Sequence, residues 1–404
     1  DEAESRWRRL ATARDQVAAA AGDPDALLPA LERLNSEFEA VTGAEATRRA
    51  GKVYAARGLI YEDTVRDLDV VIGRDVLAHL ERPLEVLLRA TRWLCAELAD
   101  AFTTALDELF DDLTGASPEG AVPLSELWFL AQGVFFGRET PTAQVTKVFQ
   151  ERWTALFDPR FTSGAEIAEV PQGPEIPGDS EAMAALEARA AELFPEREPA
   201  WSRARIHSPD VQLCATDVEA LRRGDFTAVL GEMHAAWATF DIASATELHR
   251  RPDDLAAALT ADLGPHRVRL LYPPDWPRAT GRLTQPLIGP TDIQLGFAAA
   301  PGADRTRLRP AAGLVVRRAD DQTERLVAVA EDGRSWPLPE IFADLLSVHA
   351  VDALKVTGRR PHTPRLAIGK LVVTRETWCT TIAETGLAHA LGERERFLAA
   401  RRWR

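Results

Sequence analysis

The feature that most constrains the fold is a long repeat of apolar residues that begins at Pro83. Apolar side chains recur every three or four positions over about eight helical turns. They are Leu84, Leu87, Leu88, Leu94, Leu98, Phe102, Leu106, Leu109 and Leu113. This spacing places them along one side of a helix, which must then be buried against other elements. The repeat predicts a helix from Pro83 to about Leu113, the clearest element of the chain.

Shorter patterns predict the elements on either side of this helix. Two helices are expected over residues 3–21 and 24–41, because Asp23 and Pro24 are typical of a helix start and Gly43 of a helix end. Between them and Pro83, apolar and aromatic residues over 52–61 and 68–72 predict two short strands.

The rest of the chain predicts a mixture of helices and strands. Helices are expected over 124–135, 142–157, 181–194, 338–354 and 383–401, and strands over 204–215, 315–318, 326–330 and 366–374. Residues 216–222 and 227–239 are interpreted as helix or mixed structure, and Asp332-Gly333 as a tight turn between antiparallel strands. Residues 159–180 are rich in proline and glycine, which is typical of a linker.

These patterns predict an α+β protein of several subdomains, with helices mixed with antiparallel sheet. A chain of 404 residues exceeds the size at which single cores stop growing, so more than one domain is expected. We place a helix-rich subdomain with a short strand pair at 1–158, the linker at 159–180 and an α+β subdomain at 181–404. Because the chain begins at Asp1 without methionine and ends on a run of arginines and tryptophan, we expect a fragment.

Composition narrows the environment and the classes of partner. Three widely separated cysteines, no apolar run of about 18 residues and no signal sequence indicate a reducing, cytoplasmic setting without a membrane span. The net charge of −14 argues against a general nucleic-acid binder. A local basic face is still possible, because Arg48, Arg49, Lys52, Arg57 and Arg66 lie in one stretch.

The common enzyme motifs are missing from the sequence. It contains no phosphate-binding loop, no GxGxxG, no HExxH, no CxxC and no GxSxG. An enzymatic function must therefore rest on an unusual chemistry or on a family resemblance.

Two groups of polar residues invite a functional interpretation and a structural one. The stretch from Arg57 to Asp63 could direct a carboxylate into a cleft beside a cation, or could be an exposed strand that ends in a solvated charged turn. His207, Ser208 and Asp210 are too close in sequence to assemble a nucleophile triad. A Ser-Pro-Asp turn before the next strand and a polar loop at a cleft both fit them.

Glu232 and His234 form a third candidate group. They stand two positions apart and would point away from each other on a helix, so no metal site is expected.

Three stretches together resemble the lantibiotic-type dehydratase family. They are residues 34–63, which include Leu34-Asn35-Ser36-Glu37-Phe38 and Lys52-Val53-Tyr54, residues 206–210 with 224–234, and Pro364 to Trp378. Their order and spacing extend over about 350 residues, which makes the resemblance more specific than any one stretch.

The resemblance implies an enzyme that transfers glutamate from glutamyl-tRNA to serine and threonine side chains of a ribosomal precursor peptide, in lanthipeptide or thiopeptide biosynthesis. It implies no metal and no other cofactor, since glutamyl-tRNA is a co-substrate. The expected partners are this tRNA, a precursor peptide with its leader, and an elimination domain or protein that removes the glutamate. An earlier, leader-binding segment of the family is not recognised in the chain, so activity of the fragment alone is not implied by the resemblance.

The resemblance also suggests site residues. Asp63 corresponds to a functional aspartate of the family, with Arg57 as the second catalytic candidate, and Arg48, Arg49 and Lys52 are candidate contacts to the tRNA. Two alternatives stay open. One is a peptide aminoacyl-tRNA ligase of the same family, which would form an amide, and the other is a non-catalytic scaffold that binds a peptide at a sheet edge.

Overall fold

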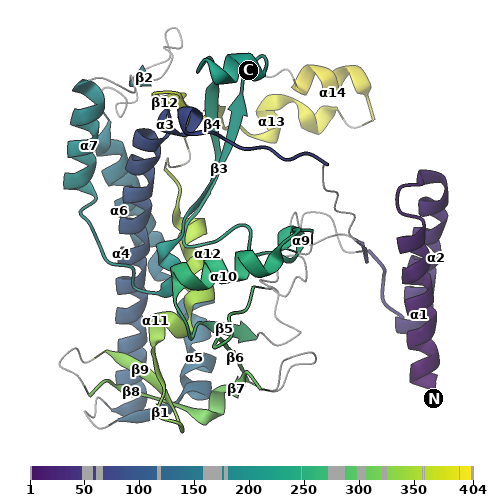
Figure 1. The fold of residues 1–404 in the computed structure, drawn as a ribbon, viewed down its shortest axis with the longest axis vertical. Coiled ribbons are helices and arrows are strands. Elements are labelled where there is room, and N and C mark those ends of the chain that lie inside the picture. Colours follow the sequence, from purple (N-terminus) through teal and green to yellow (C-terminus); the bar gives the residue numbers. More distant parts are fainter. Residues whose placement is uncertain are drawn as a thin grey trace. The chain divides into compact units, whose positions relative to one another are not determined.

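The computed structural model describes most of the chain in two compact units. The described residues are 2–47, 58–60, 67–115, 120–157, 175–176, 181–246, 248–271, 287–297, 306–320, 325–356, 358, 360–390 and 392–401. The first unit comprises Asp1–Asp69, Ile242–Leu248 and Thr280–Thr284, and the second comprises Val70–Asp241, His249–Ala279 and Gln285–Arg404. The elements of each unit are labelled in Figure 1.

The first unit is built on a pair of helices, α1 (Glu2–Ala19) and α2 (Pro24–Thr42), which pack side by side. The Asp23 side chain accepts hydrogen bonds from two backbone N–H groups of the first turn of α2, and Gly43 ends this helix with a φ of 68°. A small core of Ala13, Val17, Ala30 and Leu34 joins the helices. Both predicted helices are therefore confirmed. The single turn α9 (Ala243–Thr246) belongs to the same unit.

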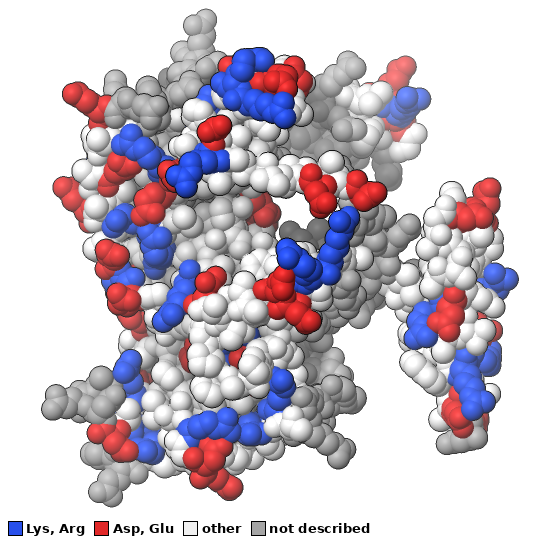
Figure 2. Space-filling view, in the orientation of Figure 1, with Lys and Arg blue, Asp and Glu red and all other residues white. Residues whose placement is uncertain are grey.

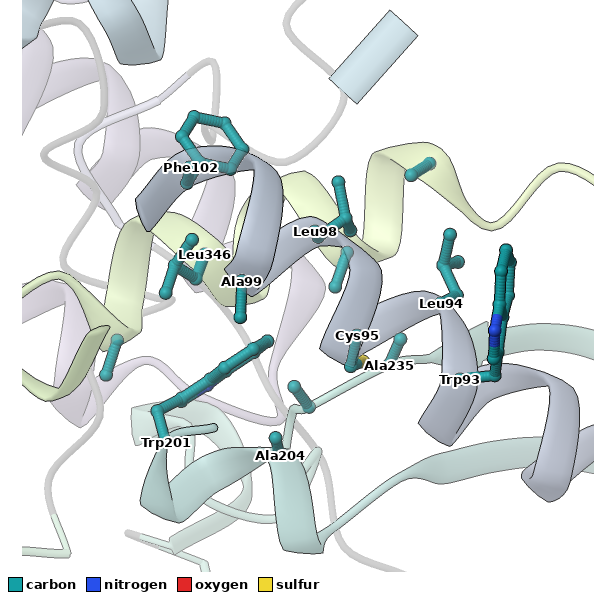
Figure 3. Close-up of a cluster of buried hydrophobic side chains, with 14 of the residues drawn as sticks. Trp93, Leu94, Cys95, Leu98, Ala99, Phe102, Trp201, Ala204, Ala235 and Leu346 are labelled. Carbon is teal, nitrogen blue, oxygen red and sulfur yellow. The ribbon is translucent and has the colours of Figure 1, made fainter. Parts of the chain in front are cut away.

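The second unit is organised around α4, Glu81–Thr114, which confirms the long predicted helix. The short helix α3 (Arg74–Ala78) precedes it, and α5 (Leu124–Phe136), α6 (Pro141–Leu156), α7 (Glu181–Leu193) and α12 (Ala343–Ala353) pack against it. Figure 3 shows Leu98 and Phe102 of α4 with Trp201 and Leu346 in this core. The spacing of three and four residues that predicted the helix is thus the spacing of its buried side.

The proline- and glycine-rich segment 159–180 does not separate two compact units, because the helices on either side of it share one core. Phe194, which directly follows α7, lies 5.5 Å from the Trp93 ring of α4 and 5.8 Å from the Phe149 ring of α6. Arg82 of α4 also pairs with Glu187 of α7 at 2.8 Å. The boundary between the units lies instead at residues 69 and 70.

The described residues of the second unit form four sheets. The largest has the order β2-β12-β13-β4-β3, in which β3–β4 and β12–β13 are antiparallel and the other neighbours parallel. A four-stranded antiparallel sheet has the order β1-β8-β9-β10, a three-stranded parallel sheet the order β5-β6-β7, and β11 pairs with β14. The mixture of helices and sheets confirms the α+β class.

The strands and the remaining helices have the following bounds. The strands are β1 (Ala121–Pro123), β2 (Glu175–Ile176), β3 (Ser208–Cys214), β4 (Thr227–His234), β5 (Val268–Leu271), β6 (Ile293–Gly296), β7 (Leu308–Pro310), β8 (Leu314–Arg318), β9 (Leu326–Ala330), β10 (Ser335–Pro337), β11 (His362–Thr363), β12 (Leu366–Ile368), β13 (Leu371–Thr374) and β14 (Thr377–Trp378). The other helices are α8 (Val218–Arg222), α10 (Pro252–Leu263), α11 (Leu338–Ile341), α13 (Ile382–Thr385) and α14 (Arg394–Arg401), with 3₁₀ turns η2 (Ser202–Arg205), η4 (Ala311–Gly313) and η5 (Leu387–His389).

Several predicted elements differ from the structure. Residues 68–72 form no strand. Their side chains are exposed, so the apolar residues that predicted a strand have no neighbouring sheet face to pack against. Residues 227–234 are strand β4, and the predicted last helix is divided at Gly386 and Gly392, whose φ angles are 71° and 79°. Most of the strand predicted over 52–61 lies outside the described residues. Among the described helices, none is both long and apolar enough to cross a membrane.

Candidate functional site

The site residues predicted from the sequence lie outside the described part of the chain. This applies to Asp63, Arg57, Arg48, Arg49 and Lys52. Of the stretch that contains them, Gly58, Leu59 and Ile60 are described, and the two apolar side chains pack against the α1–α2 core. The structure therefore places neither the predicted aspartate nor its predicted cations.

The β3–β4 hairpin, which Figure 1 shows as two paired strands, contains a β-bulge that exposes polar side chains. Pro209 pairs with Met233 and Val211 with Leu230, so two residues of β4, Gly231 and Glu232, face one residue of β3. Leu230 and Met233 are consequently both buried although they are three positions apart. The extra residue turns the side chains of Glu232 and His234 to the opposite, more exposed side.

The bulge brings together a carboxylate–imidazole group of Asp210, Glu232 and His234. The Nε2 atom of His234 lies 3.5 Å from Glu232 Oε2, and its Nδ1 atom lies 3.8 Å from Asp210 Oδ1. Imidazole and carboxylate side chains are the groups that enzymes most often use as general acids and bases. The expectation that Glu232 and His234 point apart was wrong, because in a strand residues two positions apart share a face.

Among the described residues, no three histidine, cysteine, aspartate or glutamate side chains are arranged so that they could hold a metal ion.

His207 and Ser208, which precede Asp210 in the chain, support the backbone. Ser208 Oγ donates to the carbonyl of Trp237 at 2.7 Å, and His207 Nδ1 accepts from the N–H of Ala236 at 3.0 Å. Ala236 has a positive φ of 53°, which is uncommon for a residue with a side chain, so the imidazole fixes an unfavourable turn. The inference that these neighbours form no nucleophile triad agrees with these contacts.

Burial, together with the smaller effect of the positive charge of Arg92, lowers the pKa of His207 to about 4. The imidazole is therefore neutral at pH 7. Its Nδ1 accepts the Ala236 bond, so the neutral ring carries its proton on Nε2, which is buried and has no hydrogen-bond partner in the described structure. His207 is thus a structural residue whose contact depends on its remaining neutral.

A second polar feature, the buried ionic network, consists of three ion pairs beside the parallel sheet. Arg267 pairs with Asp292 at 2.7 Å and Arg269 with Asp241 at 2.9 Å, and all four side chains are at most 8% exposed. The third pair joins Arg203 of η2 to Asp344 of α12 at 2.6 Å.

The network fixes the backbone before β6. Asp241 accepts from the N–H of Leu287, and Arg269 donates to the Leu287 carbonyl at 2.6 Å. Asp292 accepts from the N–H of Gly289 at 2.8 Å, where an added Cβ would lie 3.0 Å from Arg267 Nη2. Burial lowers the pKa of Arg269, with the charge of Arg203 acting in the same direction. Each charge is matched by an opposite one, so the network explains local order and leaves no free charge for a ligand.

Sequence reasoning missed both features for identifiable reasons. The alternation of apolar and polar residues over Thr227–His234 could have indicated a strand, but a glycine and a glutamate interrupt it at the bulge. Arg267 and Arg269 alternate as residues on an exposed strand face would, and no local signal distinguishes a buried arginine whose partner lies far along the chain.

The molecule is thus a mixed α+β protein with a helical core around α4 and a carboxylate–imidazole group on a β-bulge. Residues 1–332 match the family model described as lantibiotic dehydratase, N terminus, and the chain belongs to this family. No curated protein matches the chain.

Two solved structures are similar to the chain. The glutamylation domain of TbtB from thiomuracin biosynthesis has 15% sequence identity and a TM-score of 0.47, over 92% of this chain and 46% of that one. The same domain bound to 5′-phosphodesmethylglutamycin has 16% identity and a TM-score of 0.45, over 96% of this chain and 49% of that one. The chain spans about half the length of these structures.

Proposed function

We propose that the protein is the glutamylation component of a peptide dehydratase, which transfers glutamate from glutamyl-tRNA to serine and threonine side chains of a ribosomal precursor peptide. The observation that carries the proposal is the match of residues 1–332 to the lantibiotic dehydratase family. The precursor peptide and the charged tRNA are the two substrates, and an elimination domain or protein is the partner that consumes the product. Because charged tRNA is a cytoplasmic substrate, the proposal places the reaction in the cytoplasm.

The proposed reaction exchanges one ester for another. The hydroxyl oxygen of serine or threonine attacks the glutamyl carbonyl carbon, its proton passes to a base, and the ribose oxygen of the tRNA leaves with a proton. One ester bond forms as another breaks, so the atoms and charges of the reaction balance without a nucleotide or metal cofactor. The protein must hold the two substrates in line and provide a proton acceptor.

Asp63 is the proposed carboxylate that orients the attacking hydroxyl, with Arg57 beside it in the chain. Arg48, Arg49 and Lys52 are the proposed contacts to the tRNA, through their attraction to phosphate. The carboxylate–imidazole group is the competing candidate for the proton acceptor, because His234 lies between two carboxylates on an accessible face. The same assay distinguishes the two candidates.

The test incubates the full-length protein with glutamyl-tRNA and the precursor peptide, and reads the mass of the peptide. We expect one glutamyl unit to be added per modified hydroxyl. Asp63→Ala is compared with Asp15→Ala, which removes an exposed carboxylate of α1 whose ion pair with Arg14 lies at the surface. His234→Gln is compared with His249→Gln, because His249 is exposed and its ring bonds, among the described residues, only the N–H of Arg251.

Loss of transfer in Asp63→Ala with the peptide still bound, and normal transfer in Asp15→Ala, supports Asp63 as a site residue. Loss in His234→Gln alone assigns the proton acceptor to the bulge instead. An unmodified peptide that is bound by the wild-type protein in the presence of charged tRNA overturns the transferase proposal and favours the peptide-binding scaffold.

A further inference from the structure

A polar stripe runs along the outer side of α6, opposite its buried side. Phe149, Trp153 and Leu156 of this helix are buried in the core. Lys147, Gln150, Glu151 and Thr154 follow one another at helical spacing and line a cavity of about 540 Å³. The cavity is therefore walled on one side by a single helix face that carries hydrogen-bonding groups.

Two arginines complete the lining from other parts of the chain. Arg189 comes from the exposed side of α7, and Arg360 follows Gly358 in the segment between α12 and β11. The α6–α7 cavity, as we call the space lined by these six polar residues, thus gathers cations from three segments. Three positive charges stand against the one carboxylate of Glu151 in a chain whose net charge is −14.

The cations of the α6–α7 cavity have few partners inside the protein. Arg189 and Arg360 make no hydrogen bond or ion pair with any described residue, and Lys147 Nζ lies 4.0 Å from Glu151 Oε1. Some exposed arginines elsewhere are held by carboxylates, such as Arg222 by Glu219 at 2.5 Å and Arg251 by Asp254 at 3.1 Å. The cavity therefore offers two guanidinium groups that no described carboxylate holds, and its one carboxylate, Glu151, lies beside Lys147.

The hydrogen-bonding capacity of this lining suits a phosphate group. A guanidinium binds phosphate oxygens through two parallel N–H bonds, and a lysine adds a point charge. Gln150 and Thr154, which make no hydrogen bond with other described side chains or backbone, add an amide and a hydroxyl donor. Figure 2 shows basic and acidic side chains intermixed over the coloured part of the face in view. A phosphate site such as the α6–α7 cavity is therefore a local group of cations and does not belong to a broad basic surface on that face.

We propose that the α6–α7 cavity binds a backbone phosphate of RNA, with Arg189 and Arg360 as the principal contacts. The identity of the RNA as a tRNA rests on the proposed function, whereas the phosphate chemistry rests on the cavity. Contacts of this kind position the RNA and do not read its sequence.

The test measures binding of labelled, uncharged tRNA to the full-length protein by fluorescence anisotropy over a range of salt concentrations. The variant Arg189→Gln/Arg360→Gln removes both guanidinium groups. The matched control Arg222→Gln/Arg251→Gln changes the net charge equally but removes arginines that already have carboxylate partners. Circular dichroism establishes that the variants are folded. The variant Arg189→Lys/Arg360→Lys keeps the positive charges and removes the two parallel N–H bonds that a guanidinium can donate to a phosphate. It therefore tests how much the shape of the guanidinium contributes to tRNA affinity.

We expect the cavity variant to bind tRNA more weakly, with the slope of log K against log salt smaller by about 1 to 2, and the control to match the wild type. The lysine variant should keep the slope and lose part of the affinity. Equal tRNA binding by the cavity variant and its control, or no tRNA binding by the wild type, overturns the proposal. So does a result in which inorganic phosphate or polyglutamate binding depends on these arginines while tRNA binding does not.

The two proposals can fail separately. Binding of uncharged tRNA requires no glutamyl transfer, so a transferase that loses no tRNA affinity in the cavity variant disproves the cavity assignment alone. A protein that binds tRNA through Arg189 and Arg360 and never modifies the peptide disproves the proposed function alone.

Discussion

His207 makes the stability of the second unit depend on pH in a way that can be calculated. Its pKa in the folded protein is about 4, while a solvated histidine titrates near 6.5. Because the folded protein has the lower pKa, the stability that the neutral His207 imidazole contributes is present in full above about pH 6.5. This stability is lost as the pH falls from about 6.5 toward 4. Protonation of Nδ1 also removes the acceptor for the N–H of Ala236.

The magnitude follows from the two pKa values. At pH 5 an unfolded imidazole is mostly protonated and the folded one mostly neutral, so proton binding favours unfolding by about 2 kcal/mol relative to pH 7. His207→Asn supplies a side-chain oxygen that can accept the Ala236 bond and does not titrate. Its free energy of unfolding should therefore fall less between pH 7 and pH 5, by about 2 kcal/mol, than that of the wild type.

Urea unfolding followed by tryptophan fluorescence measures this difference, because Trp93 and Trp201 are buried in the same unit. Both proteins contain the same carboxylates, so the contribution of the carboxylates to the pH dependence of unfolding is the same in both and cancels in the comparison. Parallel pH dependences for the wild type and His207→Asn would refute the reasoning, since they would show that the imidazole is equally protonated in the folded and unfolded states.

Two further predictions concern buried groups. Asp292→Ala leaves Arg267 buried without its carboxylate and should lower the free energy of unfolding by about 3–5 kcal/mol, while Arg267→Met/Asp292→Leu should lower it less, as measured by urea unfolding. Burial raises the pKa of the Cys95 thiol, so a disulfide reagent at pH 8 should label Cys214 and Cys379 in the native protein and Cys95 only after unfolding; three labelled thiols in the native state would contradict this.

The helices could be predicted because their signals are local. The apolar spacing of α4, the Asp23 cap and Gly43 each act within a few residues of the feature they specify, and the structure confirms them. The antiparallel strands β8 and β9 and the turn at Asp332-Gly333 were predicted for the same reason, since they are neighbours in sequence; the short strand β10 after the turn was not predicted.

The features that were not predicted depend on contacts between distant residues. The shared core across 159–180 requires Phe194 to meet Trp93, and the strand β4 is defined by its pairing with β3 and β13. The carboxylate–imidazole group arises because one inserted residue changes which side chains are exposed, which a helical interpretation of the segment could not reveal. Asp63 and Arg57 stay predictions, since they lie outside the described residues.

The most direct test of the account is the chemical nature of the bond formed on the peptide. The full-length protein is incubated with tRNA charged with radiolabelled glutamate and with the precursor peptide, and the labelled peptide is treated with hydroxylamine at alkaline pH. We expect the label to be released, because the glutamyl group is held as an ester, and never to attach to a peptide whose serines and threonines are replaced by alanine. A label that resists hydroxylamine and attaches to the substituted peptide would contradict side-chain ester transfer and identify an amide-forming ligase.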